Sequence, residues 1–388
     1  MTMVKKKKKA AEINTRNQEP CEEEAAAMPT SPYLTQHLLV EILSKLPVKP
    51  LLRFKCVSKR WRSLISDPHF IKAHLNQSLK NFNIQTQRIF IATPNYPFRV
   101  YTVSFGSSDH DDIDVEVSNI DFLFQNINNP HPRWRIVGSC HGLICMLVDF
   151  GMIRVFNPST RESKQIRDCD DPPGSIVGFG FGYDQCSDDY IVVKINGNGM
   201  YVYSLRNFSC WRKVHDFTKY DVLSNGTQLN GAFHWLCLDK DSHKPSEIAV
   251  FRFEDEKLWT IPLPASFNHA FELGVFEGCL CIPPCGGDAF WAMREYGVNQ
   301  SWAKLHIKLP FFVTLQPLTT LRNHEAVCLT DFRKLVLYNT REGTSRDLVV
   351  HVDADVRFFR AIIYVDSLVS PVMEKNVIKE ENTLNLGD

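Results

Sequence analysis

Short β-rich runs separated by turn-forming residues fill the chain from Arg88 almost to its end. They include RIFIAT, RVYTVSF, GLICML, YIVVKI, GAFHWLCL, EIAVFRF and KLVLY, and clusters of Gly, Pro, Asn and Asp lie between them. Short strands at spacings of roughly eight to twelve residues are typical of all-β sandwiches and barrels, not of alternating strands and helices. This pattern restricts most of the chain to an all-β architecture.

A repeated unit lies within this β-rich region. It consists of an apolar residue, an aromatic residue and a polar turn, and it occurs at Val155-Phe156, Val202-Tyr203, Val250-Phe251 and Leu337-Tyr338. The first three begin 47 and 48 residues apart, and the last interval of 87 residues leaves room for a degenerate unit at Trp291-Ala292-Met293. A period of about 45 residues with about four strands predicts propeller blades, about six in all. A pair of packed sheets, as in a β-sandwich, is the alternative.

The stretch from Tyr33 to Leu75 has a helical pattern instead. Apolar residues recur at every fourth position in its first part, as on one face of a helix, at Leu38, Ile42 and Leu46. Thr35 is suited to cap this helix, and Pro47 ends it. We expect a second helix to begin at Pro50, a residue suited to the first helical position. The sequence therefore predicts an α-helical module ahead of the β-rich region.

Further helix signals follow in the same stretch. Ser58 can cap a third helix, and Asp67-Pro68 is typical of the start of a fourth, short one. Apolar side chains surround these helices instead of forming a single stripe. A unit of about forty residues rarely buries enough surface to fold alone. The excess must be covered by the rest of the chain, as in an ordinary helical cap, or by another protein.

Within this module, the residues LLVEILSKLPVKPLLRFKCVSKRWRSLISDPHF resemble the F-box of plant F-box proteins. The run LP-V-K-x-LL-RF-x-C-V-x-K-x-WRSLI-x-DP-x-F carries the resemblance. The family often has a proline and an acidic residue where this chain has Thr35-Gln36-His37. The resemblance implies a three-helix F-box that binds an SKP-family adaptor and, through it, cullin and RING subunits. The positions expected to bind the adaptor are Leu38, Ile42, Leu43, Leu46, Pro47, Leu51, Leu52, Val57 and Trp61.

The β-rich region is similar to the F-box-associated domain of plants. GSCHGLICM, VFNPSTRE, GFGFGYD, LNGAFHWLC and a final YVDSLVSP occur in the family's order, and the resemblance covers about residues 88 to 370. In that family the domain is a platform that recruits substrates. The expected fold class is therefore α+β multidomain, with an N-terminal three-helix F-box and an all-β propeller of about six blades.

Together the two resemblances imply a substrate-recognition subunit of an SCF-type E3 ubiquitin ligase, which is not itself an enzyme. The F-box would hold the adaptor, and the β domain would recruit an unknown protein for ubiquitination and proteasomal degradation. The contribution to catalysis would be proximity. A propeller lectin or interaction scaffold without ubiquitination is the alternative from another class.

The expected domain organisation follows from changes in composition. We expect a disordered tail at residues 1–30, the F-box at 31–76, a polar linker at 77–87, the β domain at 88–370 and a polar tail at 371–388. The basic block Lys5 to Lys9 is either a nuclear import signal or a solvated tail. We expect the protein in the nucleus and cytoplasm.

Charge and hydropathy exclude several classes of function. Lys and Arg number 44, as do Asp and Glu, so the net charge is zero and no global field favours nucleic acid or an anionic membrane. No run of eighteen apolar residues is present, which excludes a spanning helix. We do not expect the N-terminus to be a secretory signal. The twelve cysteines are therefore expected to stay in a reducing compartment as free thiols. Neither nucleic acid nor membrane is an expected partner.

Three patterns invite a chemical interpretation, and each has a structural alternative that we favour. The glycines of GFGFGYD lack the G-x-G-x-x-G spacing of a dinucleotide site, and we expect them where strands crowd. Cys279, Cys281 and Cys285 invite a metal, but no matching Cys or His pair lies near them in the sequence. Cys140 with His141, or Cys237 with His234, would need a third group to orient the histidine. We expect no metal and no cofactor.

Seven basic residues make the helical module positive: Lys45, Lys49, Arg53, Lys55, Lys59, Arg60 and Arg62. Alone they are compatible with a DNA-binding helix–turn–helix. That interpretation requires a core behind Trp61, Leu64 and Ile65, which the module lacks. Electrostatic help in docking on an acidic adaptor fits the pattern better.

Overall fold

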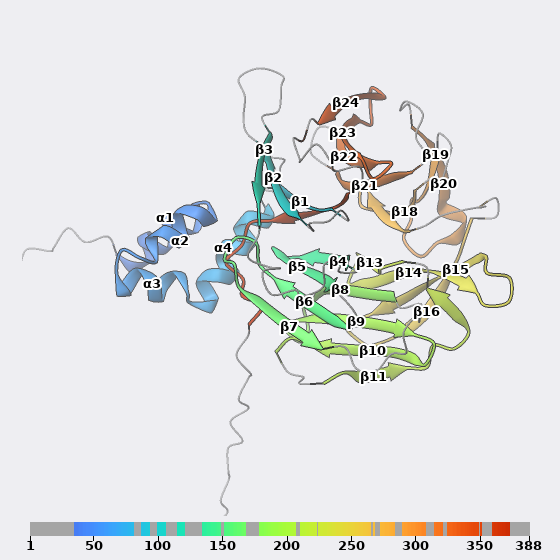
Figure 1. Cartoon of the computed structure of the whole chain (residues 1–388), viewed down its shortest axis with the longest axis horizontal. Coiled ribbons are helices and arrows are strands. Elements are labelled where there is room, and N and C mark those ends of the chain that lie inside the picture. Colours follow the sequence, from blue (N-terminus) through green and yellow to red (C-terminus); the bar gives the residue numbers. More distant parts are fainter. Residues whose placement is uncertain are drawn as a thin grey trace, which may run out of the picture.

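The computed structural model contains, in the part of the chain that it describes, four α-helices followed by six β-sheets arranged in a ring (Figure 1). The described residues are 35–80, 87–93, 99–105, 115–120, 134–148, 151–167, 178–206, 210–222, 224–264, 267, 272–283, 289–307, 314–320, 324–348, 350 and 359–372. The predicted tail at 1–30, with its Lys block, and most of the tail at 371–388 lie outside these residues.

The helical module begins with α1 (Gln36–Ser44), α2 (Val48–Phe54) and α3 (Lys59–Ile65) and continues into α4 (Pro68–Lys80). The predicted caps are confirmed. The Thr35 hydroxyl accepts from the backbone N–H of Leu38 at 3.5 Å, and the Ser58 hydroxyl accepts from that of Trp61 at 3.1 Å. The Asp67 carboxylate accepts from two N–H groups of the first turn of α4, at 2.9 and 3.1 Å. Local sequence therefore fixes these three helix starts.

Two expectations about the helices need correction. Helix α2 begins at Val48, not at Pro50, and Pro47 is its extended N-cap residue. Pro50 is tolerated there because the first turn of a helix leaves its N–H groups without intrahelical partners. Helix α4 runs to Lys80 and so enters the segment 77–87 that the sequence predicts to be a linker. It continues because Ile71, Leu75 and Leu79 pack on the core between the second and third blades.

Six sheets of at least four strands form the β domain. From the centre of the ring outward, the first blade contains β25 (Arg360–Val365), β1 (Gln87–Ala92), β2 (Val100–Phe105) and β3 (Val115–Asn119), and the second contains β4 (Trp134–Cys140), β5 (Leu143–Val148), β6 (Met152–Phe156) and β7 (Ser163–Arg167). The third contains β8 (Gly178–Asp184), β9 (Asp189–Asn196), β10 (Gly199–Ser204) and β11 (Arg212–His215), and the fourth contains β12 (Tyr220–Val222) with β13 (Thr227–Leu229), β14 (Ala232–Asp239), β15 (Pro245–Arg252) and β16 (Leu258–Pro262). The fifth contains β17 (Gly274–Phe276), β18 (Cys279–Ile282), β19 (Ala289–Met293) and β20 (Trp302–His306), and the sixth contains β21 (Leu315–Thr320), β22 (Glu325–Thr330), β23 (Lys334–Asn339) and β24 (Thr344–Leu348).

This arrangement is a six-bladed β-propeller, which confirms the predicted fold and excludes the β-sandwich. The repeated apolar-aromatic units lie in β6, β10, β15 and β23, and the degenerate unit lies in β19. All five are the third strand of their blade. The repeat is visible in the sequence because these strands fill equivalent places between neighbouring blades.

Strands from the two ends of the β domain close the ring. Strand β25 pairs antiparallel with β1, from Val365 opposite Gln87 to Arg360 opposite Ala92. The innermost strands then follow one another around the centre in the order β25, β4, β8, β13, β17 and β21. Closure removes the open edge that an incomplete ring would leave between its first and last blades.

The GFGFGYD segment forms β8, as the structural interpretation predicts. Phe179 and Phe181 are buried in the same core cluster. A Cβ atom on Gly180 would lie 3.0 Å from the Phe233 ring, and one on Gly178 would lie 2.7 Å from a methyl carbon of Val222. These glycines let the third and fourth blades approach closely, and no helix follows them to form a phosphate site.

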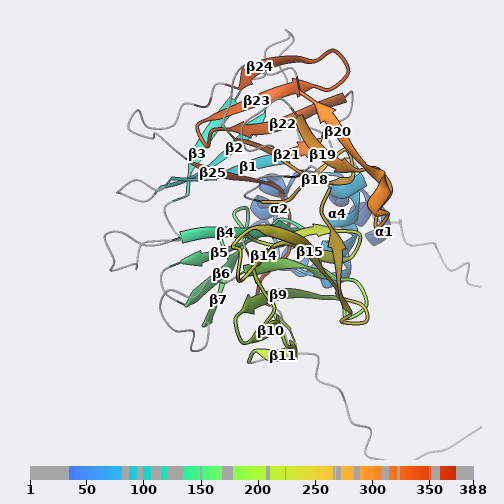
Figure 2. The same cartoon turned by 90° about the vertical axis from the view of Figure 1, so that its right-hand side faces the viewer.

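Two segments hold the helical module against one face of the propeller (Figures 1 and 2). One is α4, whose Leu75 is buried with Leu143 and Val369. The other is the C-terminal strap, which we define as Asp366–Pro371, directly after β25. Its Leu368 is buried in the core of the helical module, with a relative exposure of 3%. The strap therefore contributes side chains to the cores of both domains.

A buried asparagine fixes the strap in place. The Asn157 side chain is fully buried and donates to the carbonyl oxygens of Ser367 and Val369 at 3.0 and 2.7 Å. Its own side-chain oxygen accepts from the N–H groups of Ser159 and Thr160. On the module side, the Lys72 ammonium of α4 lies 2.7 Å from the Asp188 carboxylate in the turn after β8. Polar and apolar contacts thus set the orientation of the two domains together.

Candidate functional site

The nine positions predicted to bind an adaptor fall into separate groups in the helical module. Leu38, Ile42 and Val57 are 45%, 47% and 66% exposed, and Leu38 and Ile42 lie four residues apart on one helix. Leu43 and Leu51 are buried, at 2% and 0%. The remaining positions are Leu46, Leu52 and Trp61, which are half-buried, and Pro47, which is exposed. The structure thus separates candidate contact residues from core residues, a division that the sequence does not provide.

The core of the module is covered on one side by the chain itself. Leu43, Leu51 and Ile65 pack with Leu368 of the C-terminal strap and with Phe70 of α4. Leu38 and Ile42 are one turn apart on α1 and remain outside this core. The excess apolar surface is therefore divided: the strap and α4 bury one part, and another part stays open to a partner.

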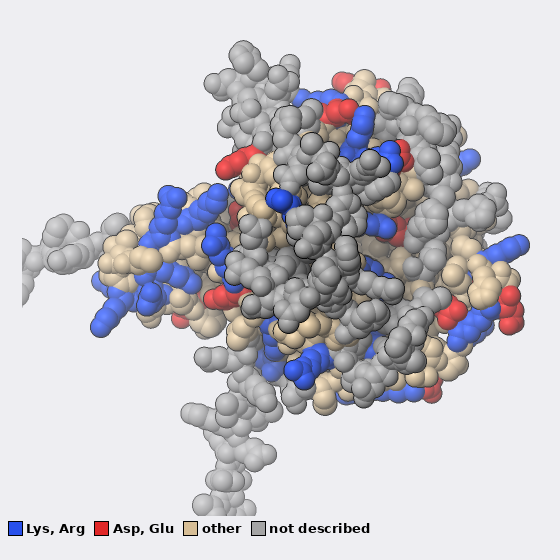
Figure 3. All heavy atoms as spheres, viewed as in Figure 1, with Lys and Arg blue, Asp and Glu red and all other residues tan. Residues whose placement is uncertain are grey.

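Basic side chains surround this open surface. Figure 3 shows Lys and Arg gathered over the helical module and few acidic side chains beside them. Between Thr35 and Ser66 the chain has seven Lys and Arg residues and one acidic residue, Glu41. Glu41 forms a salt bridge of 3.1 Å with Lys45, and this hydrogen bond lowers the pKa of the Glu41 carboxyl. The surface suits an acidic partner, because complementary charge steers association.

The two cysteine–histidine pairs are not arranged as catalytic dyads. The Nδ1 atom of His141 lies 3.1 Å from the Tyr190 hydroxyl, and burial raises the pKa of Cys140 to about 12. The His234 ring lies 3.1 Å from the Thr227 carbonyl oxygen and 2.8 Å from the Tyr296 hydroxyl. Cys237 is likewise buried, with its pKa raised to about 12. A thiol with a raised pKa is a poor nucleophile at neutral pH.

The metal interpretation of the CLCIPPC segment finds no support in the described residues. Cys281 is buried, Cys279 is half-buried, and Cys285 lies outside the part of the chain that is described. No group of three His, Cys, Asp or Glu residues within the described ranges could hold a metal ion. Nor does any described helix combine the length and hydropathy needed to cross a membrane.

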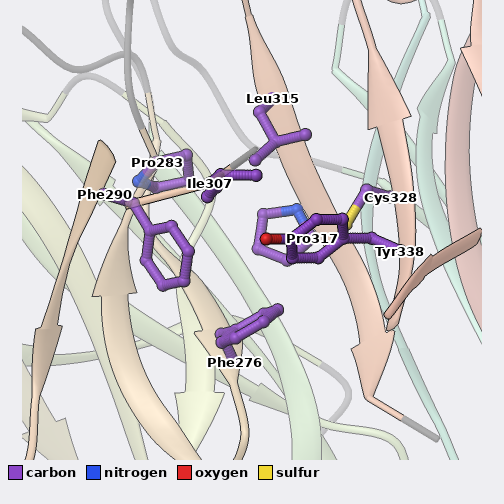
Figure 4. A pocket seen from close by; sticks show the side chains of 8 residues that line it. All are labelled: Phe276, Pro283, Phe290, Ile307, Leu315, Pro317, Cys328 and Tyr338. Atoms are coloured by element: carbon purple, nitrogen blue, oxygen red, sulfur yellow. The ribbon is translucent and has the colours of Figure 1, made fainter. Parts of the chain in front are cut away.

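Among the described residues, a small cavity and a large channel are found in the propeller. The smaller, of about 10 Å³, is apolar and lies between the fifth and sixth blades (Figure 4). Its lining side chains are Phe276, Pro283, Phe290, Ile307, Leu315, Pro317, Cys328 and Tyr338. A space of this size is at the lower limit for one water molecule, so it is a packing gap and not a ligand site. The larger is a channel of about 1220 Å³ along the centre of the ring.

The channel residues are the part of the structure that sequence patterns do not reveal. Polar residues line the channel at or just before the beginnings of inner strands: Arg135, Asn225, Glu272, Gln316 and Arg360. They come from five different blades and share no motif or spacing. Ring closure alone brings them together, so no signal within one stretch of sequence could have identified them.

Comparisons with known proteins agree with this architecture. A family model described as "F-box associated beta propeller domain" matches residues 90–369, and one described as "F-box domain" matches residues 33–73. The chain is 29% identical to the F-box/kelch-repeat protein At3g23880 of Arabidopsis thaliana, over 87% of this chain and 96% of that protein. It is 28% identical to the F-box protein CPR1 of the same plant, over 68% of this chain and 70% of that protein.

Proposed function

Because the chain belongs to the plant F-box proteins with an F-box-associated β-propeller domain, we propose that it is a substrate-recognition subunit of an SCF-type E3 ubiquitin ligase. The family supports a role as a substrate adaptor in general. The finer proposal is that the helical module binds an SKP-family adaptor, which connects it to cullin and RING subunits. The propeller then holds a protein to be ubiquitinated and degraded, and the contribution to the reaction is proximity.

The exposed apolar surface of α1 is the observation that carries this proposal. Leu38 and Ile42 lie one turn apart, close to half exposed, on a helix whose other face is already packed. Full burial of a side chain of this type contributes about 1.5–3 kcal/mol, so covering the exposed half of each contributes on the order of 1 kcal/mol. Adaptor binding would remove this surface from water, and the basic residues around it would steer an acidic adaptor.

Charge placed on this surface tests the proposal. We expect the double variant Leu38→Asp with Ile42→Asp to lose the adaptor in a pull-down with an SKP-family protein, because two carboxylates would be buried without partners. The matched control is Val298→Asp, which places the same charge on a residue of the propeller that is 40% exposed. The control should bind at wild-type strength.

The same pair of variants discriminates the proposed role from that of a scaffold. Undiminished adaptor binding by the double variant would contradict the assignment of α1 as the interface. Failure of the wild-type chain to co-purify with adaptor and cullin would favour an interaction scaffold without ubiquitination. Proximity labelling in cells with an inhibited proteasome gives a further comparison. The wild-type protein should enrich ubiquitinated targets, and the double variant should not.

A further inference from the structure

The channel at the centre of the propeller is large enough to admit a ligand and has a mixed polar and apolar lining. Its volume of about 1220 Å³ exceeds the roughly 300–1,000 Å³ of most small-molecule pockets. The walls are the inner strands β4, β17, β21 and β25, together with residues 224–228. Apolar side chains such as Leu273 and Ile362 line it, and a small number of polar groups stand among them. A mixed lining of this kind combines burial with orientation.

The polar groups gather at one end of the channel. We define the polar ring as Arg135, Asn225, Glu272, Gln316 and Arg360. Each lies at the first or second residue of an inner strand, or two residues before one. Inner strands of successive blades run in the same direction around a propeller, so their beginnings lie at a common end. The polar ring therefore surrounds one mouth of the channel.

This mouth faces away from the helical module. The module contacts the opposite ends of the inner strands, where Lys72 reaches Asp188 just after β8 and the C-terminal strap directly follows β25. Figure 2 shows the ring of blades with the helices behind it. A protein entering through the polar ring would approach from the side that an adaptor on the helical module leaves open.

Two oxygen atoms of the polar ring lack hydrogen-bond donors among the described residues. The side-chain oxygens of Asn225 and Gln316 are buried and have no partner among the described residues. The Asn225 amide group cannot simply turn around, because its Nδ2 donates to the Ile136 carbonyl oxygen. A buried acceptor without a donor is unfavourable, and a ligand that supplies the donor removes this cost. The ring is therefore suited to a ligand that brings N–H groups.

The polar ring contains one exposed cation, Arg360. The Arg360 guanidinium is exposed in the channel and lies 3.9 Å from the centre of the Phe332 ring. The Arg135 guanidinium lies 5.2 Å from the centre of the Phe179 ring. Glu272 is the acidic member, and burial raises the pKa of its carboxyl, with Arg360 opposing that shift. The exposed Arg360 guanidinium favours a ligand that carries a negative charge.

We propose that the polar ring is a binding site for an extended, acidic peptide segment of the target protein. A peptide backbone supplies N–H donors to the oxygens of Asn225 and Gln316, and an acidic side chain supplies a carboxylate to Arg360. A simple anion would satisfy the arginine but leave both oxygens without donors. This inference deepens the proposed function, on which it rests for the presence of a target.

A random peptide library tests the site directly. The probe is a phage-displayed library of linear peptides, selected on the full-length protein, and the affinity of the selected peptides is measured by fluorescence anisotropy. We expect the selected peptides to share an acidic residue and to bind Arg360→Glu at least tenfold more weakly than wild type. The matched control is Arg167→Glu, the same substitution on an exposed residue of the outer strand β7, which should bind normally.

Arg360→Gln provides a second, uncharged variant that keeps the length of the side chain, and it should weaken binding in the same direction. Thermal unfolding of each variant shows whether the fold is intact. Peptides without a shared acidic residue, binding that is insensitive to both Arg360 variants, or a selection that yields no binder would each overturn the proposal.

A further arm separates a peptide from a small acid. N-acetylglutamate amide carries the same carboxylate on a single residue, and it should compete at least a hundredfold less well than a selected peptide. Equal competition would show that the channel takes a small carboxylic acid and would overturn the peptide assignment. The adaptor pull-down is independent of these measurements, so loss of adaptor binding with retained peptide binding would count against the ligase role alone.

Discussion

His234 is a residue at which burial determines how the fold responds to pH. Its side chain is fully buried in β14, and burial lowers its pKa from the ordinary 6.5 to about 4. Between pH 6.5 and pH 4 the unfolded chain binds a proton that the folded protein does not. The contribution of His234 to the free energy of unfolding is therefore fully present above pH 6.5 and falls as the pH decreases through this range.

The size of this effect can be measured. At 1.4 kcal/mol for each pKa unit, His234 should remove about 2 kcal/mol from the free energy of unfolding between pH 7 and pH 5. We expect His234→Gln, which does not titrate, to be less stable than wild type at pH 7 but to lose about 2 kcal/mol less on going to pH 5. Urea unfolding at the two pH values measures the difference. An identical loss in both proteins would show that His234 is not responsible.

At this scale the sequence indicates which residues lie on helices of the module but not which way their side chains face. The i, i+4 pattern correctly groups Leu38 with Ile42, and the family resemblance adds Leu43 to the same set. The structure leaves Ile42 exposed and buries Leu43, although the two are adjacent. The buried side packs on Phe70 of α4 and on Leu368, which comes from the far end of the chain. A local pattern has no access to that contact.

At the scale of elements, the C-terminal strap connects the two domains, and we expect one substitution to break this connection. Leu368 is 3% exposed in the core of the helical module. We expect Leu368→Ala to cost about 2–5 kcal/mol, as truncation of a buried leucine does, and to loosen α1–α3 before the propeller. Limited proteolysis should then cleave the module faster while the thermal transition of the propeller changes little.

The control for this variant is Val372→Ala, just beyond the strap, where the side chain is 61% exposed. It should leave proteolysis unchanged. If Leu368→Ala behaves like Val372→Ala, the strap does not hold the module, and α4 alone makes the connection.

Elements marked by local chemistry are predictable from the sequence, and elements defined by distant pairing are not. Thr35, Ser58 and Asp67 mark helix starts because each side chain caps the residues that follow it. The third strands of five blades repeat because they occupy the same environment. The pairing of β25 with β1 leaves no such trace, since it joins residues from opposite ends of the β domain. The extension of α4 to Lys80 is hidden for the same reason: its partners lie in the propeller.

At the scale of the whole molecule, the packing of α4 on the propeller determines where one folding unit ends. The sequence places the boundary before residue 88, but Ile71 and Leu79 of α4 pack on the core that includes Leu143 and Val155. Without α4 that apolar surface would be open to water. The helix therefore belongs energetically to the propeller as well as to the helical module.

Two fragments test this boundary. We expect residues 67–372, which keep α4 and its Asp67 cap, to be monomeric and to unfold cooperatively at a temperature close to that of the full chain. Residues 87–372 should unfold at a lower temperature and bind a hydrophobic dye, because the surface under Leu75 is exposed. Circular dichroism should show strand content in both, since all six blades remain. Equal stability of the two fragments would place the boundary where the sequence puts it and would make α4 a linker helix. A lower stability of residues 87–372 would show that α4 is part of the folding unit of the propeller.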